Sequence, residues 1–257
     1  MTAQMNPLDA LELSARRLHR IVGTLDDATI VRPAYPAEWT IAQVMSHLGS
    51  GAAIGRRRLE DELAGRVTPD DIAPQVWDDW NAKSARAQVD DGLAADAALV
   101  SALGALDDEE RARIDVAMGP LRFGFDGLVH LRLNEHAVHT WDIEVALDDS
   151  ATIPVEVAAL VVDNLELIAR FTARATPGAP ATVTIGTSDV ERRFTLELTD
   201  EGASLVPSVD TTSDRDVVLP AEAFARLVYG RLDPTHMPPV NGDPELIDRI
   251  RATFPGP

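Results

Sequence analysis

The spacing of apolar residues changes near residue 150, and this change is the strongest constraint on the fold of the chain. Before that point, apolar residues recur at helical spacing and are separated by polar or proline-containing breaks. After it, one further apolar helix is followed by short alternating segments, which are typical of strands and turns. We therefore expect an α+β protein with two domains, 1–150 and 151–257.

Four helical stretches occupy the first domain. They cover residues 8–25, 40–63, 75–106 and 126–147, with a longer connection at 107–125. The second stretch has the clearest beginning, because Thr40 is a good N-cap and Gln43 completes a capping box. Trp39 and Val44 occupy the two hydrophobic-staple positions. Segment 90–92 is a candidate break in the third stretch. This pattern predicts a four-helix bundle.

The second domain is predicted to be a small α+β unit. A linking region at 151–180 contains an apolar helix (154–175) and a turn-rich break (176–180). Four strands are expected at 181–186, 192–199, 203–207 and 216–220. Pro220 begins a helix that ends near Gly230, and Pro244 begins the last helix.

The composition limits the classes of partner. A chain of 257 residues with 45% hydrophobic and 25% charged residues is globular, and its net charge of −19 argues against nucleic acid and anionic membranes. The basic run 56–58 is followed by the acidic run 60–62, which favours a solvated helix face. The sequence contains neither a secretory signal nor an apolar run of membrane-spanning length, so we expect a cytoplasmic protein.

The chain contains no cysteine, which excludes disulfides, thiolate metal ligands and an internal thiol nucleophile. Of its 23 basic residues only Lys83 is a lysine. Together with the abundance of alanine, this bias suggests a GC-rich genome.

Three residues form a candidate metal site. Glu135 and His139 are four positions apart on a helical segment, so their side chains share one face. His47 lies within another predicted helix, on its apolar side, where a histidine needs a partner. Two histidines and one carboxylate leave coordination positions open, which is the pattern of catalytic rather than structural zinc.

The spacing alone leaves alternatives open. His47 could be a hydrogen-bonded core histidine, and Glu135 with His139 could be a helix-surface pair. His136 and His130 are further candidates on the same helix. Residue types and periodicity therefore do not by themselves select the ligands.

Two segments resemble a known family. EWTIAQVMSHL (38–48) and RLNEHAVHTWD (132–142) are similar to the ligand motifs of the mycothiol-dependent maleylpyruvate isomerase family, part of the DinB-like superfamily. The resemblance implies a DinB-like helical domain with His47, Glu135 and His139 as metal ligands. It leaves His130 and His136 outside the site.

The resemblance extends into the second domain. RDVVLPAEAFARLVYGRLDP (215–234) is similar to the closing strand–helix segment of that family, in which an arginine serves the active site. It implies Arg231 as a catalytic residue, although an arginine at a helix end can also bind the last carbonyls. Arg132 is an alternative cation near the ligands, and Asp142 is either a surface acid or a partner for a ligand histidine.

The resemblance also implies an activity. Zinc, or another divalent metal, would hold mycothiol as its thiolate, which adds to an electrophilic double bond and allows cis-trans isomerisation, as of maleylpyruvate to fumarylpyruvate. Mycothiol is a thiol of actinobacteria, so an actinobacterial source is implied. One alternative is a mycothiol S-transferase acting on another electrophile, and another is a non-catalytic metal-containing protein that binds a small molecule. The expected partners are a thiol and an anionic small molecule.

Overall fold

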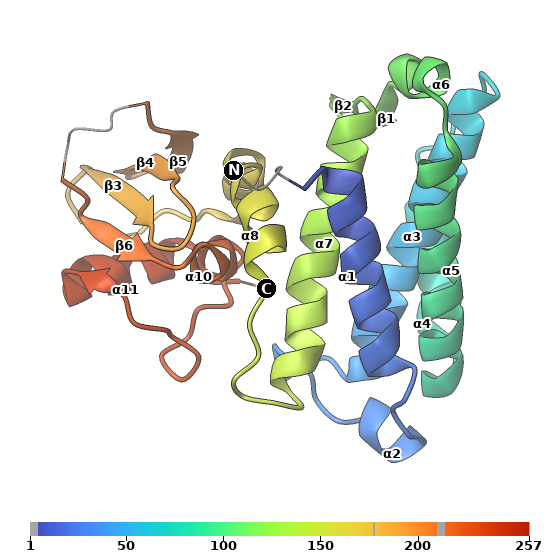
Figure 1. Cartoon of the computed structure of the whole chain (residues 1–257), viewed down its shortest axis with the longest axis horizontal. Helices are drawn as coiled ribbons and strands as arrows, with labels where there is room; N and C mark the ends of the chain where they lie inside the picture. Colours follow the sequence, from blue (N-terminus) through green and yellow to red (C-terminus); the bar gives the residue numbers. More distant parts are fainter. Residues whose placement is uncertain (1–4, 177, 210–213, 257) are drawn as a thin grey trace. The chain divides into compact units, whose positions relative to one another are not determined.

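The computed structural model describes residues 5–176, 178–209 and 214–256, and the chain divides into two compact units, Met1–Ala151 and Thr152–Pro257 (Figure 1). The first unit is helical apart from one short hairpin, and the second combines helices with a sheet. The predicted α+β class is confirmed.

The first unit is built around four long helices, α1, α3, α5 and α7. Its elements are α1 (Pro7–Val22), α2 (Asp27–Ile30), α3 (Ile41–Leu63), α4 (Ile72–Asn81), α5 (Ala85–Ala105), α6 (Asp108–Arg113), β1 (Val116–Met118), β2 (Leu121–Phe123) and α7 (Phe125–Val145). Helix α3 packs on α5 and α7, and α1 packs on the same two helices, so the four form a bundle. The predicted connection 107–125 contains α6 and the β1–β2 hairpin.

Apolar residues of the long helices meet in the centre of this bundle. Leu18 of α1, Val44 and Leu48 of α3, Val89 of α5 and Ile143 of α7 are all fully buried in one cluster. Burial of such side chains contributes about 1.5–3 kcal/mol each. The bundle is therefore a rigid support for polar side chains that enter it.

The expected break at 90–92 is wrong. These residues lie within α5, and the chain instead breaks after Asn81, where Ser84 accepts a hydrogen bond from the Ala87 amide and caps α5. Gly92 marks a close approach to α3, since a Cβ there would lie 2.8 Å from the Met45 carbonyl oxygen. Glycine is required here by helix packing rather than by a turn.

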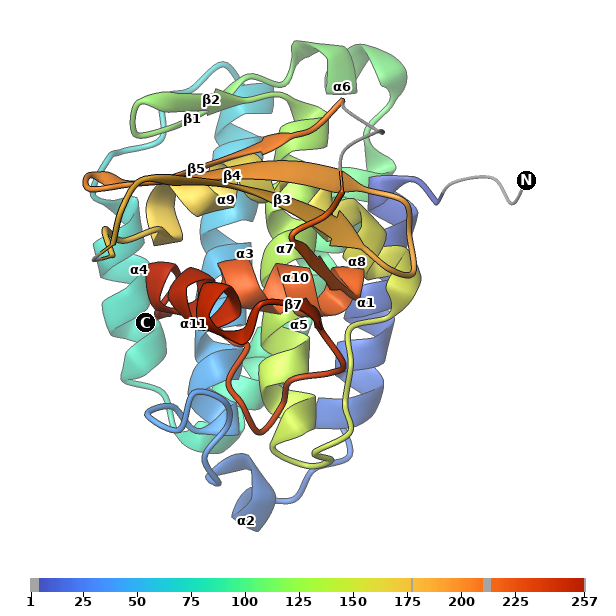
Figure 2. The ribbon, with the colours of Figure 1, turned by 90° about the vertical axis from the view of Figure 1, so that its left-hand side faces the viewer.

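The second unit contains a five-stranded sheet in the order β5-β4-β3-β6-β7, in which only the β3–β6 pair is parallel. Its elements are α8 (Val155–Val162), α9 (Leu165–Thr172), β3 (Ala181–Thr187), β4 (Arg193–Thr199), β5 (Gly202–Pro207), β6 (Val217–Leu219), α10 (Ala221–Val228), β7 (Asn241–Gly242) and α11 (Pro244–Thr253). The four predicted strands are confirmed, and Figure 2 shows β3, β4 and β5 side by side. Helix α10 packs on this sheet through Phe224, whose ring lies 5.0 Å from that of Phe194.

The single helix expected at 154–175 is wrong, because the structure forms α8 and α9 with a turn at Asp163 and Asn164. Both residues are poor helix formers. The Asp163 carboxylate accepts two hydrogen bonds from Arg192, at 2.5 and 3.0 Å. Residue 177, in the break expected at 176–180, lies outside the described residues.

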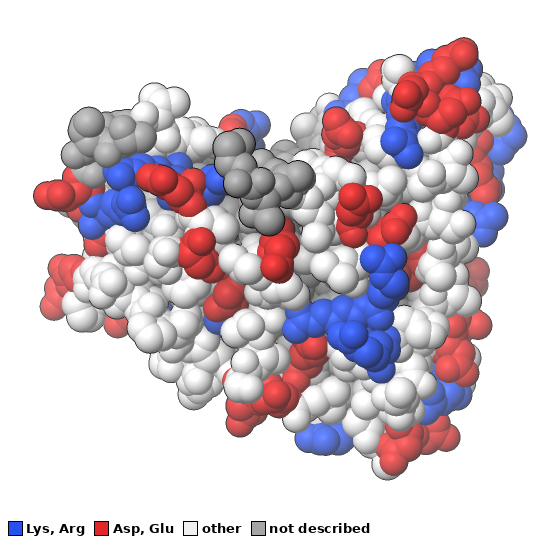
Figure 3. Space-filling model, in the orientation of Figure 1, with Lys and Arg blue, Asp and Glu red and all other residues white. Residues whose placement is uncertain are grey.

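Acidic and basic side chains are interspersed on the visible face, with acidic groups gathered over α6 (Figure 3). That helix carries Asp108, Glu109 and Glu110 in its first turn, where they complement the helix dipole. None of the helices in the described part of the chain combines the length and apolarity needed to cross a bilayer.

Candidate metal centre

His47 enters the site from the second turn of α3, and the start of this helix is set by a capping box. The Gln43 amide donates to the Thr40 hydroxyl at 3.2 Å, and the Thr40 amide donates to the Gln43 side chain at 2.8 Å. A defined first turn fixes the direction of every later side chain on the helix. The sequence-predicted cap thereby sets the beginning of α3 and the helix face that carries His47.

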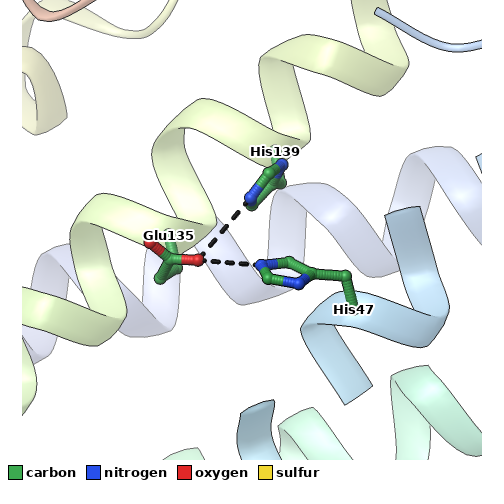
Figure 4. Close-up of side chains that lie close together, drawn as sticks. All are labelled: His47, Glu135 and His139. Atoms are coloured by element: carbon green, nitrogen blue, oxygen red, sulfur yellow. Dashed lines mark hydrogen bonds and ion pairs between the residues drawn. The ribbon is translucent and has the colours of Figure 1, made fainter. Parts of the chain in front are cut away.

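Glu135 and His139 lie one turn apart on α7 and face His47 (Figure 4). Glu135 Oε2 lies 3.0 Å from His47 Nε2 and 3.6 Å from His139 Nε2. One ligand atom from each residue lies within 4.8 Å of the other two. The structure thus brings together the three side chains that the sequence singled out.

This arrangement fits a divalent metal. Donor atoms bound to zinc at about 2.0–2.1 Å in a tetrahedron lie about 3.3 Å from one another. The distances of 3.0 and 3.6 Å from the Glu135 oxygen to the two histidine nitrogens bracket that value. Small side-chain adjustments would therefore let all three residues coordinate one ion, with at least one position left for another ligand.

The electrostatics of the site keep Glu135 ionised. Burial acts to raise the pKa of its carboxyl, but hydrogen bonds and charge interactions with His139 and His47 outweigh burial and hold this pKa well below its usual range. Burial likewise acts to lower the pKa of His139, but its contacts with Asp142 and Glu135 prevail and raise it. A cation in this site would replace those histidine protons as the partner of the carboxylate.

Asp142 orients one of the ligands. Its carboxylate is fully buried and lies 2.8 Å from His139 Nδ1, one turn along α7. Because Nδ1 is engaged, Nε2 is left facing Glu135 as the atom available to a metal. The alternative left open by the sequence is resolved, since Asp142 is a histidine partner and not a surface acid.

His136 points into a different cluster. Its Nε2 lies 2.7 Å from the Asp96 carboxylate, which also accepts a hydrogen bond from Arg132 at 2.6 Å. Arg132 donates further to the Leu48 carbonyl at 3.0 Å. Burial acts to raise the pKa of Asp96, but His136 and Arg132 outweigh it and lower this pKa. His130 also lies outside the group of three.

Trp39 has a role that the sequence did not reveal. The staple pattern predicts only packing against its own helix, yet the indole lies 5.4 Å from the His47 ring and stacks at 6.5 Å from the His139 ring. Its side chain is 39% exposed. The tryptophan therefore forms a partly open wall beside two ligands, and only tertiary packing of α3 on α7 places it there.

Two hollows adjoin the three residues. A cavity of about 470 Å³ is lined by His47 and Glu135 at one part of its wall and mainly by apolar side chains elsewhere. A second hollow of about 370 Å³ is lined by Trp39, Gln43, His47, Ser50, Trp77 and Asn81. His47 borders both. The candidate metal site is therefore bordered by two hollows of different lining.

Arg231 lies in the second unit, just after α10. It is buried, and its Nη1 donates to the Tyr229 carbonyl at 2.6 Å, as expected for an arginine at a helix end. The preceding Gly230 has φ +70°, and a Cβ there would lie 2.1 Å from the Gly256 nitrogen, so glycine is required. The catalytic role implied for Arg231 stays a prediction.

Comparisons with known proteins agree with this description. The family model for the mycothiol maleylpyruvate isomerase N-terminal domain matches residues 11–144, about half of the chain. The crystal structure of the mycothiol-dependent maleylpyruvate isomerase and that of its histidine-to-alanine mutant are similar in fold. Each has a TM-score of 0.61 and 16% identity over 88% of both chains. No curated protein matches the sequence at a significant level. The chain belongs to the mycothiol-dependent maleylpyruvate isomerase family.

Proposed function

We propose that this protein is a metal- and mycothiol-dependent enzyme that isomerises a cis double bond conjugated with a carbonyl group. The observation that carries the proposal is the group of His47, Glu135 and His139, which offers three ligands to one ion beside two hollows. Membership of the family supports mycothiol as the thiol. The absence of cysteine requires that any thiol nucleophile come from outside the chain.

Each residue has a defined task in this proposal. A bound divalent metal, for which we propose zinc, would supply a positive charge that lowers the pKa of the thiol cosubstrate, so that thiolate would be available at neutral pH. His47, Glu135 and His139 hold the ion, and Asp142 keeps the third ligand in the required orientation. Trp39 lies beside both histidine rings and forms part of the wall of the site.

The reaction requires no net change in protons. The thiolate sulfur forms a bond to one alkene carbon, and the π electrons move onto the conjugated carbonyl oxygen. Rotation about the resulting single bond follows. The electrons then return, the carbon–sulfur bond breaks, and the double bond re-forms in the trans geometry. A protein that instead protonated the intermediate and released the conjugate would be an S-transferase, so the product distinguishes the two reactions.

Turnover should require an added thiol. Metal-loaded protein mixed with maleylpyruvate and mycothiol should yield the trans product, followed by proton NMR, whereas omission of mycothiol should reduce the rate to background. Prior treatment with a thiol-alkylating reagent, removed before assay, should leave the rate unchanged because the chain has no cysteine. A full rate without thiol would contradict the mechanism. A stable conjugate in place of the trans product would favour the transferase.

Arg231 is the proposed cation for the substrate carboxylate. A hydrogen bond between charged groups contributes roughly 1.5–3 kcal/mol, so Arg231→Ala should lower kcat/KM by about ten- to a few-hundredfold. Arg231→Lys should recover part of this loss, since a lysine keeps the charge but not the paired donors. Metal content should stay unchanged in both variants. Normal kinetics combined with a lower melting temperature would assign Arg231 a structural role, such as its contact with the Tyr229 carbonyl.

A further inference from the structure

The larger hollow beside the metal ligands follows one face of α3. His47, Gly51, Gly55 and Arg58 all line it, and their separations of three or four positions place them on one side of the helix. The step from His47 to Arg58 corresponds to about three helical turns, or about 16 Å along the axis. The cavity is therefore long, with metal ligands near one end and an arginine near the other.

The walls between these ends are apolar. Ile54 comes from α3, Leu99 and Leu103 from α5, Met118 from β1 and Leu131 from α7. The hollow of about 470 Å³ is open to solvent on one side, and most of the side chains that line it are apolar. Its volume lies in the range of small-molecule sites. These properties indicate a binding cavity for an apolar body.

Arg58 is distinct from its two neighbours in the basic run. Arg56 bonds to Glu60 at 2.7 Å, and Arg57 bonds to Asp61 at 2.6 Å, as the sequence interpretation of a solvated helix face predicts. Within the described residues, no hydrogen bond or ion pair engages the half-buried Arg58 side chain, which lines the cavity instead.

Arg132 also lines the cavity, but its charge is balanced by the buried Asp96 carboxylate. Arg58 is thus the cation of the cavity wall that has no acidic partner among the described residues. A cation beside an apolar cavity favours a ligand that carries an anionic group on an apolar body.

The second hollow offers different chemistry. Gln43, Ser50 and Asn81 give it polar groups, and Trp39 and Trp77 give it aromatic faces. It suits the polar body of a thiol cosubstrate, while the apolar cavity suits the other reactant. His47 and Trp77 border both hollows, so the two reactants would meet at the metal centre.

We propose that the electrophile processed at this site is an amphipathic acid, with an apolar body lying along Gly51 and Gly55 and an anionic group bound by Arg58. This proposal rests on the proposed function and narrows its substrate class. A short dianion would leave most of the cavity empty, whereas an acid with an elongated apolar body fills it.

The first test uses straight-chain carboxylates from hexanoate to tetradecanoate, titrated calorimetrically into metal-loaded protein below their micellar concentrations. Each buried methylene contributes about 0.8 kcal/mol, so the dissociation constant should fall about three- to fourfold per added carbon. The increase in affinity should end at about ten to twelve carbons, when the alkyl chain spans the roughly 16 Å between His47 and Arg58 along α3. The matching methyl esters should bind more weakly. An affinity that is independent of chain length would overturn the proposal.

The second test uses substitutions on one helix face. Arg58→Gln should weaken dodecanoate binding about tenfold, and Arg58→Lys should recover part of it. Arg56→Gln is the matched control, because Arg56 is exposed and paired with Glu60, and it should bind normally. Unchanged binding in Arg58→Gln, combined with loss of binding when the metal is removed, would place the carboxylate on the metal and contradict the assignment of Arg58.

Gly51 allows the cavity itself to be filled. A Cβ at this position would meet only Arg132 Nη1 at 3.5 Å, so Gly51→Ala should be tolerated, and alanine also favours a helix interior. Gly51→Leu should weaken dodecanoate binding more than tenfold and hexanoate binding by a smaller factor. The metal content of this variant should be unchanged. Equal affinity of the leucine and alanine variants for dodecanoate would show that the alkyl chain of the ligand does not lie along Gly51.

These titrations contain no thiol and require no turnover. If the straight-chain carboxylates bind as described but no thiol-dependent reaction occurs, the proposed function is wrong. The assignment of the cavity to an amphipathic acid is then still supported. If thiol-dependent isomerisation of a short dianion occurs but no long-chain acid binds, the cavity proposal fails alone.

Discussion

Replacing His47 or His139 by alanine is expected to remove most of the bound metal and to lower thiol-dependent turnover by at least about 1000-fold. The loss is expected because the metal supplies several kcal/mol of catalysis in the proposed mechanism, and two remaining ligands would hold an ion poorly. Elemental analysis of the purified variants measures the metal, and the rate of trans-product formation measures the turnover. Asp142→Asn should show a milder loss of about 10- to 100-fold in metal affinity, since it disturbs only the orientation of His139.

The matched control is His130→Ala, because His130 lies on the same helix but outside the group of three. It should keep normal metal content and activity. Full metal occupancy in the His47→Ala protein would remove that residue from the site. Equal loss of metal in the control and in His139→Ala would mean that the group of three does not define the ligand set.

Asp96→Asn is expected to destabilise the protein by about 3–5 kcal/mol, because it leaves the buried Arg132 charge without its partner. Chemical denaturation of metal-loaded protein measures this change. The control is Asp91→Asn on the same helix, whose exposed pair with Lys83 contributes at most about 1 kcal/mol. Equal stability of the two variants would show that the buried pair adds nothing.

The pH dependence of this effect has a defined sign. The pKa of Asp96 is lower in the folded protein than in the unfolded chain, so its carboxylate stabilises the fold at pH values above its unfolded pKa of about 3.9. This contribution is lost as the pH falls through the lower folded pKa. The difference in stability between the native protein and Asp96→Asn should therefore be largest near neutral pH and shrink in strong acid.

Much of the architecture follows from local sequence signals. The capping box of Thr40 and Gln43 appears in the structure with both of its hydrogen bonds. The alternating segments of the second domain form strands β3 to β6 close to the predicted bounds. The four-residue step from Glu135 to His139 places both side chains on one face of α7. Each of these signals acts within a single element, where backbone geometry alone dictates the outcome.

Other features were decided only by tertiary structure. Segment 90–92 resembles a break, but packing of α5 on α3 at Gly92 keeps it helical. The spacing of residues along α7 does not show which of His136 and His139 is the candidate ligand. The partner of His136 is Asp96, which comes from another helix. Arg58 is likewise one of three similar arginines in the sequence, and only the fold places it in a cavity wall.

The physical reason for this division is the range of the forces involved. Helix and strand patterns depend on neighbours within a few positions, so residue spacing by itself determined the elements and the faces that carry His47, Glu135 and His139. The partner of a buried charge and the shape of a cavity depend on residues that are distant in the chain. Asp96 and Arg132 are 36 positions apart, and His47 and Glu135 are 88 apart. Such pairings exist only once the helices have packed, so tertiary structure alone decided them.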